Sequence, residues 1–351
     1  MYVRSNMFKE TILEYSRQKN IGELSPWFNA ALDYLIDNDV YLTEQSVKLV
    51  GEKIIFSLIE YRVQCNISTV VLGMSGGVDS ALTAALFKAA GWEVIGVTMP
   101  IHQNEAETER GVNACNVLGI THIHKDLSQL YDATLLDLHD VDPYLFSSSY
   151  VDKTVKIRRG NVRARLRMVT LYNIAAKFGG LVASTDNISE LQAGFWTLHG
   201  DVGDVSPIQS LMKSWEVPVM ARLFGVPEET WRATPTDGLG IDNGDEAQLG
   251  ATYLEWDIMV AMIQNALKRP DIDIENLVDA LRVFDYNRGV VELIEHDDCA
   301  MTVYQNVISR MRASWFKRMN PVNIKHSLDN GRYNRLADMD ARLFQPEVVR
   351  D

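Results

Sequence analysis

The sequence is poor in cysteine, with only Cys65, Cys115 and Cys299 among its 351 residues. Their spacing matches neither a disulfide framework nor a zinc site, so we interpret them as buried thiols in a reducing compartment. No run of about 18 apolar residues occurs, which argues against a transmembrane helix. The first twenty residues lack an apolar stretch followed by a small-residue cleavage site, which disfavours a secretory signal. Together these absences predict a cytoplasmic protein without a membrane partner.

Positive charge is also scarce. The chain has 34 Lys and Arg residues against 47 Asp and Glu residues, which gives a formal net charge of −13. A protein this acidic is not suited to coating nucleic acid, so no nucleic-acid partner is expected. An anionic substrate would require positive charge that is concentrated locally.

Short β-branched runs alternate with helix-like segments from about residue 69 onwards, a pattern typical of βαβ units. The predicted strands cover 69–74, 92–99, 121–124 and 181–184, and the predicted helices cover 80–90, 105–118 and 161–178. We therefore predict an α/β fold, a doubly wound and mostly parallel sheet with flanking helices and a ligand at the carboxyl ends of the strands. The expected segments are a helical N-terminal cap or interface element (1–64), the core (65–265) and a mostly helical C-terminal extension with an irregular tail (266–351).

A glycine-rich turn, residues 74–80 (MSGGVDS), lies between the first predicted strand and a predicted helix. Gly76 and Gly77 remove side-chain bulk, so backbone N–H groups and the helix N-terminus can approach a polyanion. Ser75 and Ser80 add hydroxyl donors, and Asp79 offers a hard oxygen ligand for magnesium. An ordinary helix-capping turn is the alternative. The complete string in this context favours phosphate binding, although it matches neither the Walker A pattern nor G-x-G-x-x-G.

A basic segment follows at 156–168 (KIRRGNVRARLRM), with six cations within twelve residues. On a helix Arg159, Arg163 and Arg167 share one face, whereas Arg165 points elsewhere. Stacked like charges require anions, which are either phosphates of a ligand or carboxylates of the protein itself. Charge alone leaves both interpretations open.

Two later segments are rich in polar side chains. The segment 185–201 follows the last predicted strand and begins with Thr-Asp-Asn-Ile-Ser-Glu, which also fits a helix N-cap with a capping box. The segment 207–253 contains Lys213, and its Gly- and Asp-rich part (236–246) has the composition of a mobile lid or of a plain solvent loop. The paired His122 and His124 alternate on a strand without an evident third ligand, so we interpret them as structural.

The loop at 75–80 resembles the pyrophosphate-releasing loop of N-type ATP pyrophosphatases, a superfamily that includes NAD, GMP and asparagine synthetases and tRNA-thiolating enzymes. The patterns G-N-x-x-A-R-x-R-M at 160–168, T-x-N-x-S-E at 185–190 and P-I-x-x-L-x-K at 207–213 resemble the motifs of ammonia-dependent NAD synthetases. The resemblance covers about 65–260 well, and 300–321 only through Trp-Phe-Lys-Arg at 315–318. No physical role for that last motif follows from the sequence.

The resemblance implies a role for individual residues. Catalysis is expected from Asp79, Glu190 and Lys213, of which Asp79 and Glu190 would hold Mg²⁺. The residues expected to bind ATP are Ser75, Gly76, Gly77, Asp79, Ser80, Arg167, Thr185, Lys213 and Thr236. The residues expected to bind deamido-NAD are Asn161, Arg165, Tyr172 and Asp201. The chain departs from the family at Leu198 and His199, where many members have Lys and Tyr.

The implied reaction is ATP-dependent amidation of deamido-NAD to NAD through an adenylated intermediate, carried out by a homodimer. Only about 68 residues precede the loop, which is too few for a glutaminase domain, so free ammonia is the expected nitrogen donor unless a separate subunit supplies it. The alternatives are another amidotransferase of the superfamily, such as a GMP-synthetase-like enzyme, a tRNA-thiolating enzyme, and a nucleotide-binding regulator that has lost catalysis.

Overall fold

The computed structural model describes residues 2–146, 153–234 and 244–319. Its centre is a parallel four-stranded sheet with the order β3-β2-β1-β4, formed by β1 (Thr69–Gly73), β2 (Glu93–Thr98), β3 (Thr121–His124) and β4 (Leu181–Val182). The central pair aligns Val71 with Ile95, and β4 joins the opposite edge of β1. All four predicted strands are confirmed, with boundaries that differ by one or two residues.

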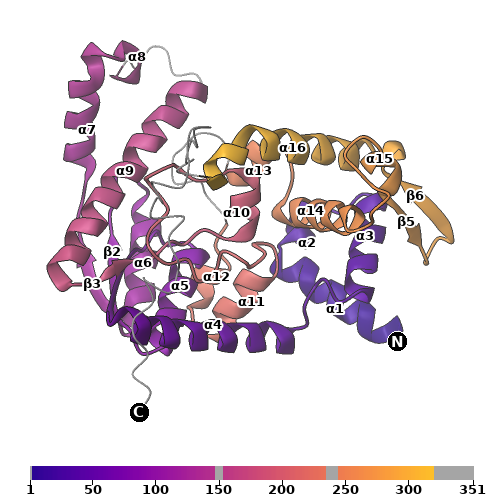
Figure 1. The fold of residues 1–351 in the computed structure, drawn as a ribbon, viewed down its shortest axis with the longest axis horizontal. Helices are drawn as coiled ribbons and strands as arrows, with labels where there is room; N and C mark the ends of the chain where they lie inside the picture. The colour runs from indigo at the N-terminus through magenta and orange to yellow at the C-terminus, as the bar shows by residue number, and fades with distance from the viewer. Residues whose placement is uncertain (1, 147–152, 235–243, 320–351) are drawn as a thin grey trace, which may run out of the picture.

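Helices cover both faces of this sheet (Figure 1). On one face Val70 and Leu72 belong to an apolar cluster with residues of α5 (Val78–Ala89) and α6 (Glu105–Leu118). On the other face Val71 packs with residues of α9 (Lys153–Phe178) and α7 (Ser128–Asp137). Successive residues of β1 therefore serve opposite layers, as the two-residue side-chain period of a strand requires. The doubly wound α/β prediction is confirmed, although α9 begins eight residues earlier than predicted.

The N-terminal segment contains four helices, α1 (Tyr2–Tyr15), α2 (Gln18–Ile21), α3 (Pro26–Asp37) and α4 (Glu44–Cys65). Trp27 of α3 is fully buried and donates its indole N–H to the carbonyl of Leu281 at 3.0 Å. Its backbone N–H donates to the carboxylate of Asp297 at 3.0 Å. The segments before and after the core therefore pack against each other.

The remaining elements comprise two that lie between β3 and β4 and others that follow β4. They are η1 (Leu138–Asp140), α8 (Pro143–Phe146), α10 (Ile188–Ala193), α11 (Glu216–Leu223), α12 (Glu228–Trp231), α13 (Asp245–Leu249), α14 (Tyr253–Leu267), α15 (Leu277–Ala280), β5 (Arg282–Asp285), β6 (Val290–Leu293), η2 (Ile294–His296), α16 (Asp298–Ser314) and η3 (Trp315–Met319). The antiparallel hairpin of β5 and β6 was not predicted. Within the described ranges, no helix combines the length and apolarity that a bilayer crossing requires.

Candidate active site

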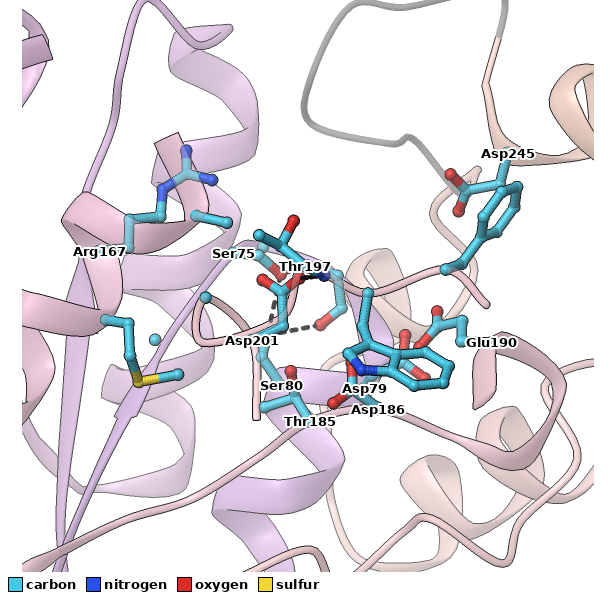
Figure 2. Close-up of a pocket in the computed structure, with 18 of the residues that line it drawn as sticks. Ser75, Asp79, Ser80, Arg167, Thr185, Asp186, Glu190, Thr197, Asp201 and Asp245 are labelled. Carbon is cyan, nitrogen blue, oxygen red and sulfur yellow. Dashed lines mark hydrogen bonds between the residues drawn. The ribbon is translucent and has the colours of Figure 1, made fainter. Parts of the chain in front are cut away.

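A cavity of about 540 Å³ opens at the carboxyl ends of β1, β2 and β4. Its walls come from the loop after β1, from α9, from the segment after β4, from the residues around α13 and from the C-terminal helix α16 with η3. Segments that lie far apart in the sequence thus meet at the edge of the sheet where open α/β folds bind their ligands. Figure 2 shows the polar side chains that point into this space.

The glycine-rich turn forms the floor of the cavity. Gly76 has φ +85°, and a Cβ atom added there would lie 2.0 Å from the carbonyl oxygen of Glu107, so no other residue fits. Ser75 Oγ accepts the N–H of Gly77 at 3.2 Å and lies 3.2 Å from Ser80 Oγ. The turn leads directly into α5, whose N-terminal N–H groups carry partial positive charge. This geometry suits a polyphosphate.

Lys213 lies between two carboxylates. Its Nζ contacts Asp79 Oδ2 and lies 3.3 Å from Glu190 Oε1, and its side chain is 8% exposed. Burial alone would lower the pKa of Lys213, but the two carboxylates raise it well above its usual value. Burial raises the pKa of Glu190 to about 7, although the positive charge of Lys213 opposes this shift. Asn187 completes the cluster by donating to Asp79 Oδ1 at 2.9 Å.

The capping-box interpretation of the segment after β4 is correct as well. Asn187 caps α10 by accepting the N–H of Glu190 at 3.0 Å, and the Glu190 carboxylate accepts the N–H of Asn187 at 3.3 Å. The same carboxylate faces Lys213, so capping fixes the side chain that the cavity presents. Asp257 anchors the adjacent backbone, because it accepts hydrogen bonds from Ser189 and Ser214, the residues next to Glu190 and Lys213.

Two further acids lie close to this cluster (Figure 2). Asp186 is 8% exposed, and its Oδ2 is buried without a hydrogen-bond partner among the described residues. Burial raises the pKa of Asp186 far above its ordinary value, and the charges of Glu190, Asp201 and Asp79 raise it further. Burial also raises the pKa of Asp201, although its Oδ2 accepts the N–H of Thr197 at 2.5 Å. The cavity therefore concentrates acidic groups whose charged forms a cationic ligand would stabilise.

The three arginines on one face of α9 have different environments. Arg159 donates to the carbonyl of Leu145 at 2.7 Å, and the guanidinium of Arg163 lies 5.0 Å from the ring centre of Tyr131. Arg167 donates to the carbonyl of Met99 at 3.1 Å and lines the cavity, where burial lowers its pKa. Of these three, Arg167 alone is placed to meet a ligand in the cavity.

The structure brings most of the predicted site residues to this one cavity. Those that line it are Ser75, Gly76, Gly77, Asp79, Ser80, Asn161, Arg167, Thr185, Glu190, Asp201 and Lys213. Arg165 and Tyr172 do not line it, since Arg165 donates to the carbonyl of Leu198 and the half-exposed Tyr172 donates to Asp204 at 2.9 Å. Thr236 and most of the predicted lid lie outside the described residues. The departure at His199 has φ 59°, an unusual conformation for a residue with a side chain.

Sequence reasoning missed the contribution of the C-terminal extension to the site. Lys317 lines the cavity and donates to the carbonyls of Gly194 and Trp196 at 2.7 Å and 2.6 Å. Arg318 donates to the carbonyls of Leu191 and Gln192 at 2.7 Å and 2.8 Å. These cations satisfy carbonyls at the C-terminal end of α10, where helices leave acceptors unpaired. The signal was the Trp-Phe-Lys-Arg motif, but its partners lie more than a hundred residues away in the sequence.

A comparison with protein families matches residues 50–281 to the model described as NAD synthase. This chain belongs to the NAD synthase family. Curated relatives include the NH3-dependent NAD⁺ synthetase of Carboxydothermus hydrogenoformans, 36% identical over 59% of this chain and 82% of that protein. The enzyme of the same name from Methanocaldococcus jannaschii is 32% identical over 72% of this chain and 95% of its own length.

Solved structures of NAD synthase relatives share the fold. The NMN synthetase of Francisella tularensis superposes with a TM-score of 0.60 at 23% identity, covering 80% of this chain and 98% of its own. The NH3-dependent NAD synthetase of Campylobacter jejuni gives 0.57 at 24% identity, covering 81% of this chain and 100% of its own. The family assignment confirms the resemblance on which the site residues were chosen, whereas the individual residue roles stay predictions.

The two strand histidines have a structural environment. His122 Nε2 and His124 Nδ1 lie 2.9 Å and 3.0 Å from the hydroxyl of Thr98. Among the residues that the structure describes, no three His, Cys, Asp or Glu side chains form a metal-binding group. The hydrogen bonds to Thr98 give both histidines a structural partner, and the structural interpretation of the pair stays a prediction.

Proposed function

We propose that this NAD synthase family member is an ammonia-dependent NAD synthetase. It joins ammonia to the nicotinate carboxylate of deamido-NAD and consumes ATP to AMP and pyrophosphate. The observation that carries this proposal is the position of Lys213 between Asp79 and Glu190, beside a glycine loop where backbone N–H groups can bind phosphates. The carboxylate of the substrate would first attack the α-phosphorus of ATP. Ammonia would then attack the mixed anhydride, and AMP would leave.

The protein contributes positioning and electrostatics to both steps. The loop amides and the start of α5 would bind the phosphates, and Lys213 would offset the charge that develops on the leaving pyrophosphate. Asn161 and Arg167 on α9 would hold the dinucleotide against the loop. The closely spaced acids Asp186 and Asp201 fit a site that must accept an ammonium ion and dispose of its protons.

Magnesium fits the donor set at the cluster of Lys213. Asp79 and Glu190 offer hard carboxylate oxygens that share one cation, and a magnesium ion needs only one or two protein carboxylates besides phosphates and waters. When bound there, the ion would neutralise charge on the triphosphate. Two carboxylates alone would bind it weakly, so we expect magnesium to arrive with ATP.

We propose that a second copy of this chain covers α4, as the homodimer expectation requires. Leu49, Phe56 and Val63 of α4 are 52%, 60% and 72% exposed and recur every seven residues, which places them on one helix face. A stripe of large apolar side chains on a monomer marks an interaction site. Light scattering of Phe56→Asp should report a monomer where the parent protein is a dimer.

Two other expectations also stay proposals. One is the division into segments 1–64, 65–265 and 266–351, which limited truncation would test. The other is the cytoplasmic location, which fractionation of the source cells would test. It rests on three free thiols, of which Cys115 is buried as predicted, whereas Cys65 is half-buried and Cys299 is exposed.

The reaction is tested by measuring NAD formed from deamido-NAD, ATP, magnesium and ammonium. Glutamine replaces ammonium in one parallel reaction, and nicotinate mononucleotide replaces the dinucleotide in another. Asp79→Asn removes one carboxylate charge from the cluster, whereas Asp271→Asn makes the same change at an exposed surface position as a matched control. We expect ammonium-dependent NAD formation that Asp79→Asn abolishes and Asp271→Asn retains. Amide formation on the mononucleotide alone would contradict the assignment of the dinucleotide, and no amide with either substrate would refute the reaction.

A further inference from the structure

The first two helices lie outside the region matched to the family, residues 50–281, yet the end of α1 contacts α12 and the residue after it, next to the cavity wall. The ring of Tyr15, the last residue of α1, stacks on Trp231 of α12 with ring centres 5.3 Å apart. Glu14 lies 3.6 Å from the guanidinium of Arg232. Tyr15 also meets Trp215 edge-on at 5.6 Å. The end of α1 is therefore fixed to the segment that enters the cavity wall.

Arg17 extends this contact into the wall itself. It adopts the left-handed conformation with φ 60°, which is rare for a residue with a side chain and lets the chain turn between α1 and α2. From there its Nη1 donates to the carbonyl of Ala233 at 3.2 Å. Ala233 and the next residue, Thr234, line the cavity. Arg17, in the turn between α1 and α2, thus contacts the backbone of the active-site wall.

The charge of Arg17 also acts on the other side of that wall. Glu246 is a half-buried acid whose pKa is raised by its partial burial and lowered by the hydrogen bond from the Tyr253 N–H and by the nearby positive charge of Arg17. Its carboxylate accepts the N–H of Tyr253 at 2.9 Å, and the Tyr253 hydroxyl donates to Asp245 at 3.1 Å. The ring of Tyr253 lies beneath Lys213, with Nζ 5.6 Å from the ring centre. Contacts therefore lead from Glu246 through Tyr253 to Lys213, and the positive charge of Arg17, which is bonded to Ala233, lies close enough to act on Glu246.

We propose that Arg17 is a positioning residue, which ties the N-terminal helices to Ala233 and Glu246 and thereby holds Tyr253 and Asp245 in place around Lys213. Turnover then depends on a segment that the family match does not include. This inference rests on the proposed function for its kinetic readout only. Small displacements of a charge-stabilising group reduce the rate steeply, because electrostatic stabilisation depends on prior orientation.

The test compares three variants. Arg17→Gly removes the guanidinium and suits the left-handed backbone, so the variant is expected to fold. Arg17→Lys keeps the charge on a shorter, differently shaped group. Lys19→Ala serves as the matched control, because it removes a cation from the same segment. The ion-pair partner of Lys19 is the exposed Glu10 on α1, and neither residue lines the cavity. We expect kcat to fall about tenfold or more in Arg17→Gly, with KM for deamido-NAD within about twofold, and to recover in part in Arg17→Lys. Lys19→Ala should match the parent.

A second readout does not require activity. Hydrogen exchange of the peptide that covers 245–253 reports the N–H of Tyr253, which Glu246 holds, and the N–H of Gly250, which bonds to the Glu246 carbonyl. Exchange there should be faster in Arg17→Gly than in Lys19→Ala. Unchanged exchange together with unchanged kcat would overturn the inference, as would equal effects of the control. If the parent protein makes no NAD, the proposed reaction fails, and the exchange result still decides the role of Arg17.

Discussion

Gly194 and Ser314 form a contact on which the active-site wall depends. Gly194 ends α10 with φ +72°, and a Cβ atom built there would lie 2.4 Å from Cβ of Ser314 on α16. The neighbouring Phe195 and Trp196 line the cavity, and Lys317 holds the carbonyl of Gly194. Gly194→Ala therefore should push α10 and α16 apart and disturb the wall that also carries Glu190.

The expected magnitude has two parts. A left-handed alanine costs about 1–2 kcal/mol relative to glycine. Steric overlap with a packed neighbour adds about 1–3 kcal/mol, because the adjacent helix must shift. The sum is about 2–5 kcal/mol of unfolding free energy. Gly179→Ala isolates the first part, since Gly179 has φ +63° at the end of α9 and an added Cβ would meet nothing within 4 Å.

A double-mutant cycle measures the steric part. Ser314→Gly alone costs about 0.5 kcal/mol through helix propensity and also removes the hydrogen bonds of the hydroxyl with Arg310 and Arg318. In that background Gly194→Ala loses its clash, so the cycle should show a coupling of about 1–3 kcal/mol. Thermal melting of the four proteins gives the coupling, and the NAD-forming assay should show that Gly194→Ala loses more activity than Gly179→Ala. If Gly194→Ala lowers the unfolding free energy by the same amount in the parent protein and in the Ser314→Gly background, the steric argument is refuted.

Three other outcomes follow from the site. Lys213→Met leaves the carboxylates of Asp79 and Glu190 facing each other without a cation. In the NAD-forming assay kcat should therefore fall about 100-fold or more. Thermal melting of the magnesium-free protein should show a loss of about 3–5 kcal/mol in unfolding free energy. Burial raises the pKa of Glu190 from 4.5 to about 7, so the folded state binds the extra proton and the magnesium-free protein should lose stability as pH rises from about 4.5 to about 7. Melting of Glu190→Gln over the same pH range should lack this loss. Lys317→Met removes both hydrogen bonds to the Gly194 and Trp196 carbonyls, so kcat/KM should fall about tenfold. Lys268→Met, the same substitution at an exposed residue, should leave kcat/KM unaltered.

The sequence alone determined the sheet and the floor of the site. Parallel strands that are buried on both faces require continuous apolar runs, and Val70, Val71 and Leu72 form such a run. The turn at 75–80 is equally local, because Gly76 adopts φ +85°, which favours glycine, and Ser75 Oγ accepts the N–H of Gly77 two residues on. Local patterns such as these can be predicted from the sequence.

Only the tertiary structure decided what surrounds that floor. Arg159, Arg163 and Arg167 share a helix face and equal chemistry, yet Arg167 alone of the three reaches the cavity, because the carbonyl of Leu145 and the ring of Tyr131 engage the other two. Lys317 meets Gly194 across 123 positions, and Arg17 meets Ala233 across 216. Neither pair leaves a periodic trace in the sequence, since a hydrogen bond to a backbone carbonyl constrains only one of its two residues. The strand and the glycine turn are properties of neighbours in the chain, whereas the charge balance around Lys213 exists only where distant segments pack together.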